Sequence, residues 1–369
     1  MAKAARPRTG LARRTAGLAS LLALILPGCA GASPAPAPQT GDAEKCAPAI
    51  ALSNAQNGLS VLIMQDGRVV CEAYSGEGGP GIGHEIWSGT KSFTGLMAAA
   101  AVKEGLLTLD EAVADTITEW RGDPVKSRVT IRQLLSLTSG VGGQPGGRAP
   151  GYATSIAAPF TAAPGERFQY GPQSFQIFGE LIQRKMKAKG ISGDSRDYVR
   201  TRILEPIGMT WTDWRRTPEG DAILAQGASF TAREWIKFGE FVRAGGRVNG
   251  QAVVDETAFR ELFKGTKANP AYGVSWWLPN ASDAPDVVTA SIDLRHHADQ
   301  LPDDMVIAGG AGNQRLYVVP SCNLSVVRQA RFGAAEIARA AESGGRSEAR
   351  AERTWSDYAF IRLVLDAFC

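Results

Sequence analysis

Histidine is scarce in this chain: its 369 residues include only three, His84, His296 and His297. A Ser-His-Asp triad needs one of them as its base, but His84 lies in a Gly-rich segment and the other two lie in a polar one. The sequence also lacks Gly-x-Ser-x-Gly, the motif that exposes a nucleophile at a strand-to-helix turn. Both absences argue against hydrolysis by a Ser-His-Asp mechanism.

The apolar run at residues 18–26 is too short to cross a bilayer as a stable helix. It follows a basic head, and together they predict an export signal over residues 1–28. The next residues, Leu26-Pro27-Gly28-Cys29, resemble the lipobox of bacterial lipoproteins, where the Cys is lipidated, although Pro27 departs from the usual small residue. Ordinary signal cleavage near residues 30–32 is the alternative.

Residues 29–45 are predicted to form a flexible tether, since much of this segment is rich in Ala, Pro and Ser and lacks apolar periodicity. Lipidation at Cys29 would make the protein a periplasmic or outer-membrane lipoprotein, attached to the membrane through its N-terminal lipid. The net charge of +3 includes five basic residues of the predicted signal, so the mature chain carries about −2. This balance gives no reason to expect a nucleic-acid partner.

Cysteine is also sparse, with four residues besides Cys29: Cys46, Cys71, Cys322 and Cys369. An even number in an exported protein favours disulfides, and three pairings are open. We weakly favour Cys46–Cys369, which would tie the two ends of the folded unit, together with Cys71–Cys322. A zinc site is the rival interpretation, but no two of these cysteines lie close together in the sequence and histidine is rare, so we expect no metal and no cofactor.

The order of the predicted elements indicates an α+β fold. Strands are predicted at both ends of the chain, at residues 59–64, 68–74, 305–308, 315–319 and 324–328. The pattern between them is mostly helical from residue 88 to about 265, and a last helix is predicted at 355–368. We therefore expect an antiparallel sheet built from both chain ends and flanked by helices, with an inserted helical lobe. The boundaries are a hydrolase domain at 46–369, its sheet lobe at 46–87 and 268–369, and its helical lobe at 88–267.

A Ser-x-x-Lys motif, Ser88-Gly89-Thr90-Lys91, opens the first long predicted helix and occurs nowhere else in the chain. The i, i+3 spacing places Ser Oγ and Lys Nζ on one helix face. The helix N-terminus favours a developing alkoxide, and a desolvated lysine loses its proton more easily and can act as a base. The structural alternative is a helix-capping Ser beside a solvated Lys.

These residues belong to a longer series that resembles the serine β-lactamase and penicillin-binding-protein superfamily, and most closely its class C-like branch of esterases, D-amino-acid peptidases and nylon-oligomer hydrolases. The matching pieces follow one another from about residue 59 to 331. They include Ser88-Gly-Thr-Lys-Ser-Phe, Glu104-Gly-Leu-Leu-Thr-Leu-Asp, Val129-Thr-Ile-Arg-Gln-Leu-Leu, Pro164-Gly-Glu-Arg-Phe-Gln-Tyr, Leu204-Glu-Pro-Ile-Gly-Met, Tyr272-Gly-Val-Ser-Trp-Trp and Gln314-Arg-Leu-Tyr-Val-Val-Pro.

The resemblance implies a second catalytic residue at Tyr170, which in the class C-like branch belongs to a Tyr-x-Asn motif and relays a proton with the Lys. Here the motif is Tyr170-Gly171-Pro172, so a side-chain amide that β-lactamases use to hold substrate is replaced by Pro172. Gln173 is a candidate substitute. A buried structural tyrosine is the alternative interpretation of Tyr170.

The resemblance also aligns Ala308-Gly309-Gly310 with the family's Lys-Thr-Gly strand, so both side-chain-bearing positions are lost. The remaining role is a backbone one, in which the amides of Ser88 and Ala311 form an oxyanion hole. Gly309, Gly310 and Trp276 are the expected substrate-binding residues. The structural alternative for the two glycines is a Gly-rich turn into an edge strand, which does not exclude the functional role.

We therefore expect a serine hydrolase that cleaves a small-molecule ester or amide through an acyl-enzyme on Ser88, with Lys91 and Tyr170 transferring protons. The missing Asn and Lys argue against strong β-lactam hydrolysis. Two alternatives stay open: a non-catalytic module that binds a cell-envelope ligand, and a peptidoglycan DD-peptidase, which rests on fold analogy alone.

Overall fold

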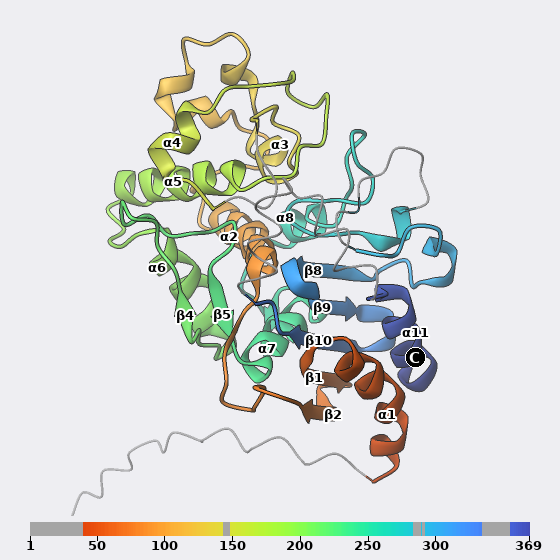
Figure 1. Cartoon of the computed structure of the whole chain (residues 1–369). Coiled ribbons are helices and arrows are strands. Elements are labelled where there is room, and N and C mark those ends of the chain that lie inside the picture. The colour runs from red at the N-terminus through yellow and green to blue at the C-terminus, as the bar shows by residue number, and fades with distance from the viewer. Residues whose placement is uncertain (1–39, 143–147, 283–288, 290–291, 334–354) are drawn as a thin grey trace, which may run out of the picture. The chain divides into compact units, whose positions relative to one another are not determined.

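The computed structural model describes residues 40–142, 148–282, 289, 292–333 and 355–369 (Figure 1). The predicted signal, Cys29 and the tether up to residue 39 lie outside these residues. Among the helices in the described ranges, none is long and apolar enough to cross a membrane.

A five-stranded antiparallel sheet is built from both ends of the chain, as the sequence predicts. Its order is β2-β1-β10-β9-β8, so the first strands and the last strands lie side by side (Figure 1). The strands are β1 (Gly58–Gln65), β2 (Arg68–Tyr74), β8 (Val306–Gly310), β9 (Gln314–Val319) and β10 (Leu324–Ala330). The turn between β1 and β2 is Asp66-Gly67, with φ of 51° and 75°, the left-handed pair that a tight hairpin favours.

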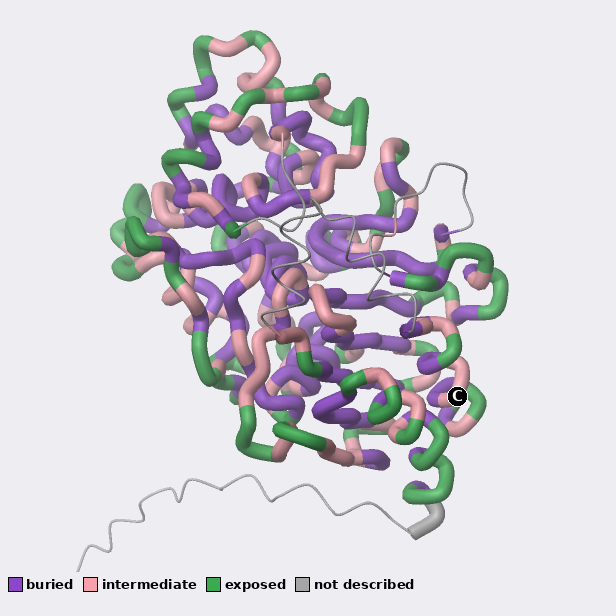
Figure 2. Tube along the Cα trace, viewed as in Figure 1, coloured by how far each residue is buried: buried purple, intermediate pink, exposed green. Residues whose placement is uncertain are grey.

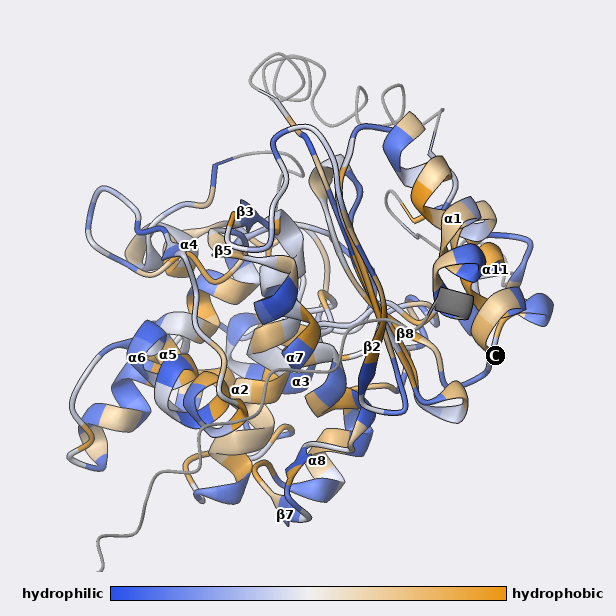
Figure 3. Ribbon diagram, turned by 90° about the horizontal axis from the view of Figure 1, so that it is seen from below, coloured by the Kyte–Doolittle hydropathy of each residue, from blue (hydrophilic) through white to orange (hydrophobic). Residues whose placement is uncertain are grey.

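One face of this sheet is covered by α1 (Thr40–Ala55) and α11 (Asp357–Phe368), which contact each other (Figure 3). Helix α1 begins at Thr40, so the predicted tether boundary at residue 45 is too late. The Ala-, Pro- and Ser-rich composition behind the prediction runs only over residues 31–41, so it did not support a tether as far as residue 45.

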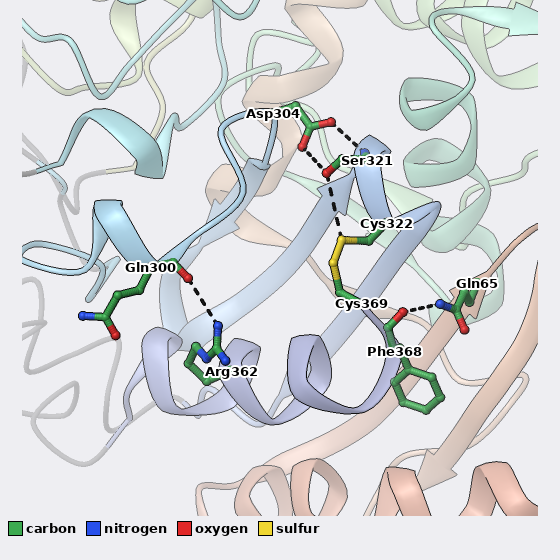
Figure 4. Close-up of a disulfide and its surroundings, with 8 residues drawn as sticks. All are labelled: Gln65, Gln300, Asp304, Ser321, Cys322, Arg362, Phe368 and Cys369. Atoms are coloured by element: carbon green, nitrogen blue, oxygen red, sulfur yellow. Dashed lines mark hydrogen bonds between the residues drawn. A yellow bond between two sulfur atoms is a disulfide. The ribbon is translucent and has the colours of Figure 1, made fainter.

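The disulfides join Cys46 to Cys71 and Cys322 to Cys369, so the pairing favoured from sequence is wrong. Helix α1 contacts β2, which places Cys46 beside Cys71 with Cα atoms 5.9 Å apart. Cys369 directly follows α11 and lies beside the turn between β9 and β10 that carries Cys322 (Figure 4). Each disulfide therefore ties one of the covering helices to the sheet.

The opposite face of the sheet packs against α7 (Ala232–Arg243), which contacts β1, β9 and β10. Gly239 allows this close approach, because a Cβ there would lie 2.7 Å from the Leu316 side chain. The sequence placed residues 88–267 in the helical lobe, but α7 within that range belongs to the sheet layer. Its amphipathic pattern predicts the helix and does not say which layer its apolar face joins.

Helix α2 (Lys91–Lys103) lies between the sheet and the remaining helices (Figure 1). Every residue from Lys91 to Ala101 is buried, so α2 is central on all sides rather than on one face (Figure 2). The other helices are α3 (Ile131–Leu135), α4 (Tyr152–Ala157), α5 (Gln173–Ala188), α6 (Ser195–Val199) and α8 (Glu256–Glu261). The remaining strands form two small sheets, β3 (His84–Glu85) with β5 (Ala228–Phe230) and β4 (Asp213–Trp214), and β6 (Arg247–Val248) with β7 (Gln251–Ala252).

Candidate active site

Ser88 lies on a single 3-10 turn, Trp87–Thr90, that leads directly into α2. Trp87 has a φ of 49°, a left-handed conformation that costs a bulky residue about 1–3 kcal/mol. Its ring packs edge-on against Phe332, with centroids 5.3 Å apart, and the Arg215 guanidinium lies 5.7 Å from it. The contacts with Phe332 and Arg215 therefore stabilise the strained Trp87, which directly precedes Ser88.

Lys91 and Ser88 are brought together as their spacing predicts. Lys91 Nζ donates to Ser88 Oγ at 2.9 Å and to the Ala225 carbonyl at 2.8 Å. The lysine is only 3% exposed, and Ser88 is half-buried. This arrangement excludes the alternative in which Lys91 is a solvated surface residue.

Tyr170 lies at the same place, because its ring centroid is 5.0 Å from Lys91 Nζ. Phe175, from the first turn of α5, lies on the amine as well, at 5.4 Å. The three predicted catalytic residues therefore converge, although Tyr170 is separated from Ser88 by 82 positions in the sequence. These two rings cover the lysine amine, in agreement with its low exposure to water.

Trp277 forms a wall behind Tyr170. The two rings stack with centroids 5.6 Å apart at 30°, and Tyr272 packs against Trp277 at 4.7 Å. Phe168 completes the cluster through contacts with Tyr170, Tyr272 and Trp277. Burial raises the pKa of Tyr272 well above its ordinary value, so that phenol stays neutral. The wall that meets Tyr170 is aromatic and uncharged.

Trp276, predicted to bind substrate, is instead a core residue. It has no exposed surface and packs on Phe238 and Phe263. Adjacent residues in an extended segment point in opposite directions, and it is the neighbouring Trp277 that faces Tyr170. The sequence Trp276-Trp277 does not reveal which of the two has which role.

The segment carrying Trp277 is joined to both the sheet edge and α2. Its backbone exchanges two hydrogen bonds with Ile307 of β8, at 3.1 and 3.0 Å. The Ser275 carbonyl accepts from Ser92 Oγ at 2.9 Å, and Ser275 Oγ lies 2.8 Å from Thr94 Oγ1. The aromatic wall, the sheet edge and the helix that carries Lys91 are therefore fixed to one another.

Strand β8 ends directly beside the turn that carries Ser88. A Cβ on Gly310 would lie 2.0 Å from the Ile86 carbonyl oxygen and 3.2 Å from Gly89 N, so only glycine fits. Gly309 and Ala308 are also buried. Within the described residues, the amides of Ser88 and Ala311 donate no hydrogen bond outside their own elements. Both predicted oxyanion donors are thus close to this strand end.

The aromatic cluster and the Ala225 carbonyl were not predicted as parts of the site. The alternation of Phe168 and Tyr170 in an extended segment was a usable signal, because residues i and i+2 share a face. The sequence gives no signal for the Ala225 contact, because the main-chain carbonyl makes it and every residue has one. Across the described ranges, no group of three or more His, Cys, Asp or Glu side chains could hold a metal ion.

Comparison with known proteins adds sequence and structural relatives. A family model described as Beta-lactamase matches residues 44–331. Protein flp of Staphylococcus aureus (strain NCTC 8325 / PS 47) is 27% identical over 188 residues, which covers 43% of this chain and 35% of that protein. The chain thus matches about a third of the length of that relative. A protein of Alkalihalophilus pseudofirmus is 22% identical over 304 residues, covering 74% of this chain and 83% of its own length.

Solved structures share the fold at low identity. EstCE1, described as a hydrolase with promiscuous acyltransferase activity, superimposes with a TM-score of 0.63 at 14% identity, over 84% of this chain and 99% of its own. A penicillin-binding-protein homologue from Caulobacter crescentus gives a TM-score of 0.57 at 18% identity, over 78% and 91%. A β-lactamase from Mycobacterium bovis gives 0.56 at 18% identity, over 82% and 99%.

Proposed function

The chain belongs to the beta-lactamase family, and from this premise we propose that it is a serine hydrolase that cleaves carboxylic esters or small amides through an acyl-enzyme on Ser88. The observation that carries the proposal is the 2.9 Å hydrogen bond between Lys91 Nζ and Ser88 Oγ in a site where the lysine is 3% exposed. A nucleophile within hydrogen-bond reach of a buried base is the arrangement that acyl transfer requires.

In the first step Ser88 Oγ bonds to the acyl carbon while its proton passes to Lys91 Nζ. Burial disfavours a charged amine, whereas the Ala225 carbonyl orients it toward Ser88. The tetrahedral intermediate then collapses, the bond to the alcohol or amine breaks, and a proton reaches the leaving group through Tyr170. In the second step water attacks the acyl carbon and gives up a proton to Lys91, the bond to Ser88 Oγ breaks, and Lys91 passes that proton to Ser88 Oγ.

The amides of Ser88 and Ala311 would stabilise the negative charge on the intermediate's oxygen. One such donor is commonly worth about 3 kcal/mol. Their position at the end of β8, next to Gly310, supports this role, because the glycine leaves no side chain between the strand and the nucleophile turn.

The surroundings of Tyr170 favour uncharged substrates over β-lactams. Pro172 offers no side-chain amide, and Ala308 offers no positive charge for a carboxylate. Phe168 and Tyr170 are only partly buried and contact each other, and their aromatic surface suits an apolar acyl or alcohol group. EstCE1, a hydrolase with promiscuous acyltransferase activity, shares the fold, and acyl transfer is the chemistry proposed here.

We also propose that the protein is exported and lipidated at Cys29, so that the hydrolase faces the periplasm or the outer surface. The basic head, the short apolar core and the lipobox-like segment support this placement. The two disulfides suit an oxidising compartment.

The proposal is tested by measuring kcat/KM of the purified mature protein on a panel of p-nitrophenyl esters, small anilides and a chromogenic β-lactam. We expect turnover of apolar esters, less of anilides and little of the β-lactam. Ser88→Ala should abolish turnover, and Ser192→Ala, on an exposed serine, should leave it unchanged. Equal turnover by Ser88→Ala and the unmodified chain would refute the proposal.

A further inference from the structure

Two arginines are completely buried beneath the turn that follows β8. Arg315 of β9 and Arg328 of β10 each have a relative exposure of 0%. Burying a guanidinium is unfavourable by several kcal/mol unless its N–H groups are paired. The partners of these two side chains therefore indicate what they hold in place.

Arg315 connects α11 to the end of β8. Its Nε and Nη2 donate to the two carboxylate oxygens of Asp357, the first residue of α11, at 2.7 and 3.2 Å. Its Nη1 donates to the Gly310 carbonyl at 2.9 Å, and Nη2 also reaches Asn313 Oδ1 at 3.4 Å. One planar side chain thus joins a buried carboxylate to both ends of the segment 310–313.

Arg328 makes the corresponding connection from α1. Its Nη1 donates to the Asn313 carbonyl at 2.8 Å, and its Nε donates to Ser53 Oγ at 3.1 Å. The Trp355 ring lies 3.7 Å from the guanidinium. Burial lowers the pKa of Arg328 to about 9, so the side chain remains charged at neutral pH and stays a strong donor.

The segment held in this way has a left-handed backbone. Gly312 and Asn313 have φ of 69° and 60°, values that glycine adopts freely and asparagine tolerates. Gly312 packs against Phe332, since a Cβ there would lie 2.4 Å from the Phe332 Cβ. Ala311, the expected second oxyanion donor, is therefore carried by a turn whose flanking residues are both anchored by buried arginines.

We propose that Arg315 is a positioning residue that fixes the Ala311 amide in the oxyanion hole, with Arg328 supporting the same turn from α1. This inference rests on the proposed function, because the amide has a catalytic role only if Ser88 forms an acyl-enzyme. An oxyanion donor acts when it lies about 2.7–3.1 Å from the developing charge. A turn that relaxes by a fraction of an ångström lowers the rate of acylation and leaves substrate contacts beside Tyr170 intact.

Arg315→Lys is the first test, because it keeps the charge beside Asp357 but one ammonium cannot bind Asp357, Gly310 and Asn313 together. We expect kcat on an apolar ester to fall about ten- to hundredfold, less than the ~10²–10³-fold cost of losing an oxyanion donor outright, because the amide is displaced and not removed. KM should change less than about threefold. A second variant, Arg315→Met with Asp357→Leu, removes both members of the ion pair, so neither of the two is left buried without the other. This double variant should also lower kcat while leaving KM nearly unchanged.

Ile361→Ala is the matched control, since this fully buried apolar residue of α11 contributes to packing and has no side-chain donor or acceptor that could hold the turn. It should lower the melting temperature and leave kcat unchanged well below that temperature. Hydrogen exchange of the peptide 306–319 gives a readout that needs no activity: it should accelerate in both Arg315 variants and not in Ile361→Ala. Unchanged exchange, or an equal loss of kcat in the control, would overturn the positioning role, whereas failure of the unmodified chain to acylate Ser88 would overturn the proposed function.

Discussion

Lys91 and Tyr170 are expected to act as one proton-transfer unit, so that their losses are not additive. Lys91→Met removes the amine that donates to Ser88 Oγ at 2.9 Å while nearly keeping the side-chain volume. Tyr170→Phe removes only the hydroxyl and keeps the ring stacked on Trp277. Each variant therefore deletes one polar group from the same route and leaves the packing in place.

General acid–base catalysis contributes about 10²–10⁴-fold, which corresponds to about 2.7–5.4 kcal/mol of transition-state stabilisation. If both groups serve one transfer, each single variant loses most of this factor and the double variant loses little more. Independent roles would instead multiply to about 10⁴–10⁸-fold. Lys91→Met also leaves the buried Ala225 carbonyl without this donor, so we expect a stability loss of about 1–3 kcal/mol in addition.

The assay is a double-mutant cycle on kcat/KM for one p-nitrophenyl ester, at a temperature where all four proteins are folded. Thermal melts of each variant separate the stability effect from the catalytic one. Strictly multiplicative losses would refute the shared route. A Tyr170→Phe variant with full activity would return Tyr170 to a structural role and leave Lys91 as the base.

Three further predictions concern stability and processing. Replacing Cys322 and Cys369 by Ser opens a disulfide that spans 47 positions, and should lower the free energy of unfolding by about 4 kcal/mol in denaturant titrations. Burial alone would raise the pKa of Asp357, but its contacts with Arg315 hold that pKa below the ordinary value. The carboxylate therefore stabilises the fold above about pH 3.9, the unfolded pKa, and this stabilisation is lost as pH falls further. Thermal melts should show a fall in Tm below about pH 4 that is shallower in Asp357→Asn, and an equal slope would contradict this. Mass spectrometry should find a mature chain beginning at lipidated Cys29, and a soluble chain that begins after it would refute lipidation.

The parts of the molecule that local pattern determines were predictable. The Asp66-Gly67 hairpin, the strands at both ends and the α+β plan follow from turn chemistry and periodicity. Ser88 and Lys91 meet because residues three positions apart on a helix lie on the same face. Tyr170 came from the family resemblance, since no local rule connects it to a lysine 79 positions earlier.

Features that depend on how the helices and strands pack against one another could not be predicted from the sequence. The disulfide pairing follows from α1 packing over β2 and α11 ending beside the turn at Cys322. Which of Trp276 and Trp277 faces the core and which faces Tyr170 depends on how their segment pairs with β8. Arg315 and Arg328 lie in strands where a charged residue normally faces solvent, and only Asp357, far along the chain, explains why Arg315 is buried.

The most direct test of the central claim is labelling with a fluorophosphonate, which reacts with an activated serine and forms a stable phosphonyl ester. Incubation of the mature protein, followed by digestion and mass spectrometry, locates the adduct. The account predicts stoichiometric modification of Ser88, loss of ester turnover in parallel, and no adduct in Ser88→Ala. An unlabelled Ser88 in the folded protein, or turnover that survives its complete modification, would contradict the claim that Ser88 is the nucleophile.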